Sequence, residues 1–304
     1  MSIIPTKYVL LTGAGFSKNF GGWTGNELRK VIITNLHKPE LQQIFIEDED
    51  YENAYTNAIE NSELNADDKT TISKAVKQSY AGLCNNMRAR WSEERGRPGH
   101  MFANFIRPFL NFKGNERPFF FTLNQDLFLE DKKGWFSPKA PKLEVGKHNF
   151  EDLEFEQITA TISPEIKIED IEKDVNNHAG PAYIKLHGSY GWYSSNGQHR
   201  LVIGNNKTQQ IKDEPLLDWY FQIFKQIMGA QKNILVIGYS FKDKHINDAL
   251  FENTEKHNGK ILIINPSIPE NIGSRKNVIF YPRTLLEIIQ DNQQWIEIQR
   301  QLFN

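Results

Sequence analysis

The chain has 304 residues, and its 36 Lys and Arg against 38 Asp and Glu leave a formal net charge of −2. Unaided binding to DNA or RNA usually needs a dominant basic field, so this balance argues against a direct nucleic-acid partner. The hydrophobic fraction of 39% supports a large core, yet no apolar run reaches the roughly 18 residues of a membrane-spanning helix. We expect a cytoplasmic protein without a secretion signal or a membrane partner.

Five short apolar runs predict β-strands, and each ends in a polar turn that leads into the next segment. The runs are 8–12, 119–122, 183–186, 233–237 and 261–264. Strands that alternate with helices predict right-handed crossovers, and hence an α/β fold with a doubly wound, mostly parallel, Rossmann-like sheet. In such a sheet, ligands bind outside the carboxyl ends of the strands, where all five polar turns are expected to lie.

Two insertions are expected between the strands. Apolar residues at helical spacing, such as Ile72, Val76 and Tyr80, predict a helical subdomain over about 37–98. The segment from about 135 to 180 is rich in charge and contains three prolines, so we expect an irregular insertion there. Towards the end of the chain, 284–303 is predicted to form a helix with one apolar face, which either packs on the sheet or mediates self-association.

A glycine-rich turn follows the first strand. Gly13-Ala14-Gly15-Phe16-Ser17 lies between a strand and a predicted helix, where small residues let the backbone approach a diphosphate. Turns of this kind are common, so the motif alone is weak. The acidic residue with which dehydrogenases bind ribose hydroxyls has no convincing position, and hydride transfer is therefore not predicted.

Other strand ends carry an amide, a carboxylate and an imidazole. Asn124 and Asp126 follow the second strand, and His187 follows the third. Each has a structural interpretation as well: the first two as turn formers or helix caps, and His187 as a buried core histidine. The last two strands are followed by Gly238-Tyr239-Ser240 and by Asn265, whose hydroxyl and amide suit ribose hydroxyls.

Taken in chain order, these motifs resemble those of the sirtuin fold family. The matching segments are Gly-Ala-Gly-x-Ser at 13–17, Thr-x-Asn-x-Asp at 122–126, His-Gly at 187–188, Gly-x-Ser at 238–240 and Ile-Asn at 264–265. The resemblance implies that 1–304 form one NAD-binding domain, with both insertions outside the matched part. It assigns catalytic roles to Asn124, His187 and Asp126, with His187 as the general base. It assigns cofactor-binding roles to Gly13, Ala14, Gly15, Ser17, Thr122, Gly238, Ser240 and Asn265.

A zinc module found in the family's protein deacylases has no counterpart in this chain. That module uses four cysteines, whereas Cys84 is the single cysteine here and also excludes an intramolecular disulfide. We therefore predict no metal site and no zinc. The chain is similar to the zinc-less, sirtuin-like NAD-hydrolysing domains of bacterial anti-phage defence systems, in which water accepts the ribosyl group.

The resemblance implies an NAD+ glycohydrolase that uses NAD as its substrate and releases nicotinamide and ADP-ribose. His187, with an ordinary pKa of about 6.5, suits proton abstraction near neutrality. Whether His187 or Asn124 activates the water stays open. Two alternatives remain: a non-catalytic module that senses NAD or ADP-ribose, and an NAD-dependent protein deacylase or ADP-ribosyl transferase.

An enzyme that depletes NAD harms its own cell unless its activity is conditional. We therefore expect a homo-oligomer that becomes fully active in a larger assembly. The resemblance implies a separate sensor partner, such as a ring-forming ATPase or a nucleic-acid-guided protein.

Overall fold

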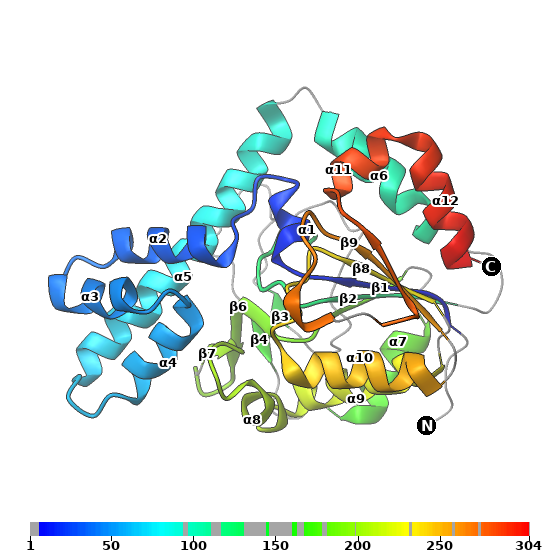
Figure 1. The fold of residues 1–304 in the computed structure, drawn as a ribbon. Coiled ribbons are helices and arrows are strands. Elements are labelled where there is room, and N and C mark those ends of the chain that lie inside the picture. Colours follow the sequence, from blue (N-terminus) through cyan, green and yellow to red (C-terminus); the bar gives the residue numbers. More distant parts are fainter. Residues whose placement is uncertain are drawn as a thin grey trace.

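The structure, a computed structural model, describes residues 6–93, 97–110, 117–130, 144–145, 160–162, 167–177, 181–197, 199–230, 233–256, 259–272 and 275–303. A six-stranded sheet in the order β10-β9-β8-β1-β2-β5 forms its centre (Figure 1). The strands are β1 (Thr6–Thr12), β2 (Arg117–Thr122), β5 (Ala182–Lys185), β8 (Asn233–Ile237), β9 (Lys260–Ile264) and β10 (Val278–Tyr281). All five neighbouring pairs are parallel, which confirms the predicted doubly wound α/β fold. The edge strand β10 was not predicted.

Strand order reverses beside β1. From β1 the chain adds β2 and β5 on one side and later returns to add β8, β9 and β10 on the other. Adjacent crossovers therefore leave in opposite directions from the carboxyl ends of β1 and β8, and this switch point is where such sheets bind ligands.

Both faces of the sheet are covered, which explains the nearly continuous apolar strands. Successive residues alternate between the two faces, so Leu10 joins one core while Val9 and Leu11 join the other. Four helices cover the first face: α1 (Ala14–Lys18), α6 (Arg97–Leu110), α11 (Leu285–Gln290) and α12 (Asn292–Phe303). The second face is covered by α7 (Ile168–Asn177), α8 (Lys207–Lys212), α9 (Pro215–Ala230) and α10 (Lys244–Lys256).

Four helices form an arm that projects to one side of the sheet (Figure 1, left). This helical arm consists of α2 (Gly25–Asn35), α3 (Pro39–Glu47), α4 (Tyr51–Glu60) and α5 (Ala66–Glu93). Leu41, Phe45 and Ile72 are fully buried within it. Helix α2 packs against α5 although it precedes the predicted start of the insertion at residue 37. A capping box between Thr24 and Glu27 fixes where α2 begins.

A second, four-stranded sheet has the order β3-β4-β6-β7. Its strands are β3 (Glu144–Val145), β4 (Ala160–Ile162), β6 (Gly188–Ser194) and β7 (His199–Leu201). Strands β3 and β4 and helix α7 are the described parts of the predicted irregular insertion at 135–180, and the rest of that insertion lies outside the described residues. These strands are too short to produce an alternating pattern in the sequence.

The predicted terminal helix over 284–303 is divided into α11 and α12 at Asp291. Its apolar residues lie in the core of the molecule, where Ile288, Trp295 and Leu302 are buried. Of the two interpretations of this face, packing on the chain's own sheet domain is the one that the structure shows. A short 3-10 turn, η2 (Glu270–Ile272), follows β9.

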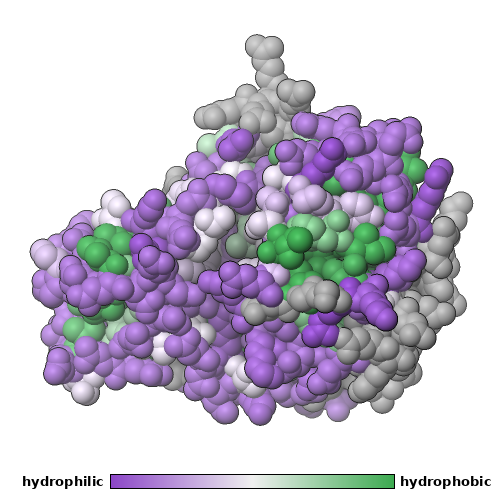
Figure 2. Space-filling model, in the orientation of Figure 1, coloured by the Kyte–Doolittle hydropathy of each residue, from purple (hydrophilic) through white to green (hydrophobic). Residues whose placement is uncertain are grey.

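The outer surface in the same view is largely hydrophilic, with apolar areas on the arm and beside the sheet (Figure 2). Ile46 and Ile268 are the large hydrophobic side chains that stand exposed among the described residues. Within the described helices, none is both long and apolar enough to cross a membrane.

Candidate active site

A pocket of about 410 Å³ lies at the carboxyl ends of the central strands, next to the helical arm. All predicted site residues except Thr122 line it: Gly13, Ala14, Gly15, Ser17, Asn124, Asp126, His187, Gly238, Ser240 and Asn265. They come from turns after β1, β2, β5, β8 and β9. Parallel strands thus bring together residues that are far apart in the chain.

Three glycines let two of these turns touch directly. The N–H of Gly15 donates to the carbonyl oxygen of Gly238 at 2.9 Å, and that of Gly13 donates to Ile237 at 3.0 Å. Gly238 has a φ of 63°, and a Cβ there would lie 2.2 Å from the backbone nitrogen of Phe16. Larger residues cannot form this floor of the pocket without displacing the backbone.

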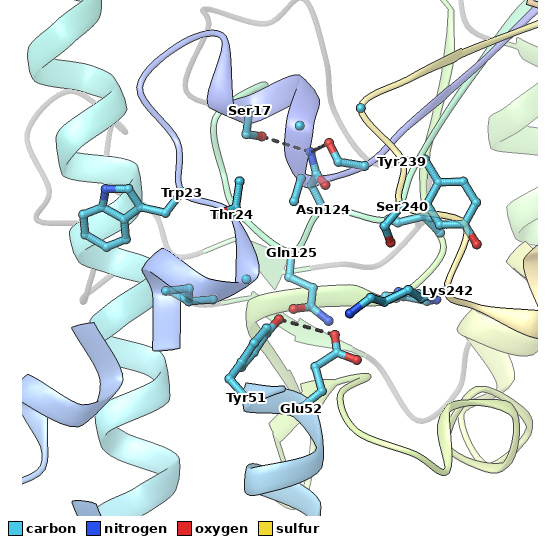
Figure 3. Close-up of a pocket in the computed structure, with 18 of the residues that line it drawn as sticks. Ser17, Trp23, Thr24, Tyr51, Glu52, Asn124, Gln125, Tyr239, Ser240 and Lys242 are labelled. Atoms are coloured by element: carbon cyan, nitrogen blue, oxygen red, sulfur yellow. Dashed lines mark hydrogen bonds between the residues drawn. The ribbon is translucent and has the colours of Figure 1, made fainter. Parts of the chain in front are cut away.

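Asn124 lies at the centre of a hydrogen-bond network on the pocket floor (Figure 3). Its Nδ2 donates to the carbonyl oxygen of Gly13 and to Ser17 Oγ, both at 2.9 Å. Ser17 Oγ donates to Asp126 Oδ2 at 2.8 Å, and Asp126 Oδ1 accepts the N–H of Phe128 at 3.0 Å. Because a carbonyl oxygen only accepts, the amide orientation of Asn124 is fixed, and Oδ1 is the atom it can offer to a ligand.

Thr122 supports this network from below the pocket. Its Oγ1 accepts a hydrogen bond from the backbone N–H of Asn124 at 3.0 Å and one from Thr12 Oγ1 at 2.9 Å. Thr122 is buried, so the structure places it in the join between β1 and β2 rather than on the pocket surface.

His187 is buried, with 3% of its surface exposed, and it follows β5 directly. Its pKa is lowered to about 3, chiefly by burial; Asp243 opposes this decrease, whereas Lys207 and His245 contribute to it. The imidazole is therefore neutral at pH 7, the form that can accept a proton. Its Nε2 lies 3.3 Å from Nε2 of His245.

A partly buried ion triad joins the helical arm to the sheet domain at the pocket. Lys207 Nζ lies 2.6 Å from both Glu52 Oε2, at the start of α4, and Asp243 Oδ1, after β8. Only 12% of the Lys207 side chain is exposed. Burial alone would raise the pKa of Asp243, but His187 and Lys207 hold it below its ordinary value. Burial also raises the pKa of Glu52, against the effect of Lys207.

Tyr51 and Tyr80 extend this junction between the helical arm and the sheet domain, and Tyr51 is labelled in Figure 3. Their hydroxyls lie 3.1 Å apart, and the hydroxyl of Tyr80 donates to Gln125 Oε1. Gln125 Nε2 in turn donates to the carbonyl oxygen of Val202. The arm is therefore hydrogen-bonded to the turn that carries Asn124 and Asp126.

Sequence reasoning missed Tyr51, Glu52, Lys207, Asp243 and His245. The cluster of charge directly after Gly-x-Ser was a usable signal for Asp243 and His245, because it follows a predicted strand end. No local pattern links Glu52 or Lys207 to the pocket, since each lies on a helix whose polar residues have the spacing of any solvent-facing helix.

In the part of the chain that the structure describes, no group of three or more His, Cys, Asp or Glu side chains is placed to hold a metal ion. Cys84 lies in the core, and its Sγ accepts the N–H of Leu127 at 3.3 Å. Burial raises the pKa of this thiol.

Comparison with known proteins gives a family match and several structural likenesses. A family model described as a SIR2-like domain matches residues 118–277, just over half of the chain. A Sir2 homologue in complex with NAD is 14% identical with a TM-score of 0.47, and the match covers 99% of this chain and 92% of that one. A mutant Sir2 homologue in complex with ADP-ribose is 14% identical with a TM-score of 0.46, over 98% and 94%. Sir2Tm bound to a propionylated peptide is 15% identical with a TM-score of 0.41, over 96% and 93%. No curated protein matches the sequence.

Proposed function

Because the chain belongs to the SIR2-like domain family, we propose that it is an enzyme that hydrolyses NAD to nicotinamide and ADP-ribose. The observation that carries the proposal is the meeting of Asn124, His187 and Asp126 in one pocket at the switch point of the sheet. Hydrolysis by water needs a group that orients the water and a base that accepts its proton. Asn124 offers an acceptor oxygen, His187 is a neutral imidazole, and the carboxylate of Asp126 anchors the hydrogen-bond network around Asn124.

The pocket has suitable partners for each part of NAD. Lys242 lines the pocket and supplies positive charge for a diphosphate, and the glycine floor allows a close approach of the backbone. Ser240 is exposed at the pocket and offers a hydroxyl. Asn265 Nδ2 donates to Ser267 O at 3.0 Å, so Oδ1 is the atom with which it can accept a ribose hydroxyl.

The proposed reaction breaks the bond between nicotinamide and ribose, and positive charge develops at the anomeric carbon. Water attacks this carbon, and nicotinamide leaves with the electron pair of the broken bond. Asn124 Oδ1 orients the water or a ribose hydroxyl by accepting its hydrogen. His187 takes the proton of the water, and the completed reaction releases one proton with ADP-ribose.

Asp126 has a supporting role in this mechanism. Its two oxygens accept hydrogen bonds from Ser17 Oγ and from the N–H of Phe128. The carboxylate thereby holds Ser17, which in turn holds the amide of Asn124.

Incubation of the purified protein with NAD, followed by chromatography of nicotinamide and ADP-ribose, tests the proposal. Asn124→Ala and His187→Ala should each lower turnover about 100-fold or more, as expected for loss of an acid–base or orienting group. The exposed residues Asn57 and His37 provide matched controls, and their alanine variants should keep wild-type turnover. The melting temperature of every variant is measured alongside.

The outcomes separate the alternatives. NAD that binds, measured by calorimetry, but stays intact under all conditions would favour the sensing module. Cleavage of NAD only in the presence of an acylated lysine peptide would favour the deacylase. Full turnover in Asn124→Ala or His187→Ala would show that the catalytic assignment of that residue is wrong.

We further propose that this activity depletes NAD in the cytoplasm as the effector of an anti-phage defence system. Uncontrolled NAD hydrolysis would kill the host, so the proposal includes a homo-oligomer that is activated by a separate sensor partner. The buried junction between arm and sheet supports control of this kind, because a partner that moves the arm also moves Glu52 at the pocket.

A further inference from the structure

His187 faces a second imidazole that no motif singled out. Nε2 of His187 lies 3.3 Å from Nε2 of His245, and the ring centroids are 5.5 Å apart at an angle of 40°. His245 lies in the first turn of α10, and its ring packs edge-on against Phe221 of α9 at 5.5 Å. Helix packing thus holds the second ring in place.

Two neutral imidazoles can share only one hydrogen across this contact. A neutral imidazole carries a single N–H, so one Nε2 must donate and the other must present its lone pair. Burial is the main cause that lowers the pKa of both rings, and Lys207 lowers both further, against the opposing effect of Asp243. Both histidines are therefore neutral at pH 7, and the tautomer of one determines the tautomer of the other.

Only one of the two arrangements leaves His187 able to accept a proton from the pocket. His187 lines the pocket, and its Nδ1 forms no hydrogen bond with any residue that the structure describes. When His187 donates from Nε2, Nδ1 keeps its lone pair. In the opposite arrangement Nδ1 carries the proton, and the lone pair on Nε2 is occupied by His245.

We propose that His245 is a positioning residue whose Nε2 accepts the Nε2–H of His187 and so keeps Nδ1 of His187 free to accept the proton of the attacking water. This inference rests on the proposed function. In the step, a lone pair of the water oxygen forms the bond to the anomeric carbon, while the bond from that carbon to nicotinamide breaks and nicotinamide leaves with its electron pair. An O–H bond of the water breaks, its electrons stay on the oxygen, and the proton goes to Nδ1. The carboxylate of Asp243 then stabilises the positive charge on the His187–His245 pair.

Two substitutions of His245 separate hydrogen bonding from packing. His245→Phe keeps an aromatic ring against Phe221 but removes the acceptor, whereas His245→Gln places an amide oxygen near the position of Nε2. We expect kcat of His245→Phe to fall about 10- to 100-fold, the range for loss of a residue that orients a catalytic ligand, with KM changed less than about threefold. His245→Gln should recover at least about a third of the wild-type kcat. Full kcat in His245→Phe, or equal losses in both variants at equal melting temperature, would overturn the proposal.

Long-range ¹H–¹⁵N spectra of the protein with ¹⁵N-labelled histidine show which ring nitrogen carries the proton, and they do not depend on catalytic activity. The signals that disappear in His187→Gln are those of His187. The wild type should show His187 with its proton on Nε2, and His245→Phe should shift it toward Nδ1. A proton on Nδ1 in the wild type would overturn the inference even if NAD is hydrolysed. NAD that stays intact under all conditions, together with the expected tautomer, would overturn the proposed function and leave the assigned direction of this hydrogen bond supported.

Discussion

The hydrogen bonds around Asn124 decide what this residue can do in the pocket. Both hydrogens of Nδ2 are engaged, one by Gly13 and one by Ser17, so the amide meets a ligand through its oxygen. Sequence position alone leaves open whether the amide donates or accepts. The direction is fixed by the Gly13 carbonyl, which belongs to a different strand end.

Burial of His187 makes stability depend on pH. Its pKa is about 3 in the folded protein against about 6.5 in the unfolded chain, so below pH 6.5 the unfolded chain binds a proton that the folded protein does not. The free energy of unfolding should therefore fall by up to about 1.4 kcal/mol per pH unit as the pH decreases from 6.5 toward 3. Urea denaturation at several pH values measures this, with His187→Gln expected to show a shallower decrease.

A matched control for this experiment is the exposed His37. His37→Gln should keep the wild-type dependence on pH, because this exposed side chain lies outside the pocket that buries His187. Parallel curves for the wild type and His187→Gln would contradict the burial argument.

Among the elements, the contact between the turns after β1 and β8 should be the most sensitive to substitution. Gly238 and Gly197 both have positive φ, but a Cβ at Gly197 meets none of the described atoms within 4 Å, whereas one at Gly238 meets the backbone. Gly197→Ala should lower the free energy of unfolding by about 1–2 kcal/mol, because an alanine at this position must adopt a left-handed backbone conformation. Gly238→Ala should lose a further 1–3 kcal/mol or so through overpacking, as measured by urea denaturation. Equal losses of stability in the two variants would mean that the turns after β1 and β8 can move apart without an energetic cost.

The ion triad gives an element-scale test of how the arm is held. Lys207→Met leaves Glu52 and Asp243 without their shared cation and should lower the free energy of unfolding. Adding Glu52→Gln removes one of the two unpaired carboxylates and should restore part of that free energy. A double-mutant cycle on the free energy of unfolding should give a coupling of about 1–3 kcal/mol. Lys244 and Asp248 form an exposed pair on α10 and should show no measurable coupling. A zero coupling for Lys207 and Glu52 would show that the arm does not depend on this contact.

For the whole molecule, the buried terminal helices narrow the possible assembly surfaces. Trp295 and Leu302 lie in the core, so self-association must use another surface than the apolar face of α12. We expect light scattering across a wide concentration range to show an oligomer, and NAD turnover to rise when the sensor partner joins it. A strictly monomeric protein with full, constitutive turnover would contradict this prediction.

The sequence by itself determined the central sheet and the positions of its polar turns. Val9, Leu10 and Leu11 are apolar in succession because both faces of β1 are covered, and a short run of this kind that ends at Gly13 favours a buried strand. Since parallel strands end at one edge, the residues after each strand, Asn124 and His187 among them, were predicted to meet. Strands β3 and β4 are too short to produce a pattern, whereas the edge strand β10 was missed although 278–281 is an apolar run as long as 119–122.

Tertiary structure alone decided which partners the polar residues have. Glu52 and Asp243 both contact Lys207 because the arm folds back over the strand ends. These residues are far apart in the chain, so no spacing within a local segment of the sequence predicts their contacts. His245 reaches His187 through the packing of α10 on the sheet. Local sequence sets the backbone preferences and the burial of each segment, whereas the direction of a hydrogen bond and the charge of an imidazole depend on atoms that only the completed fold brings near.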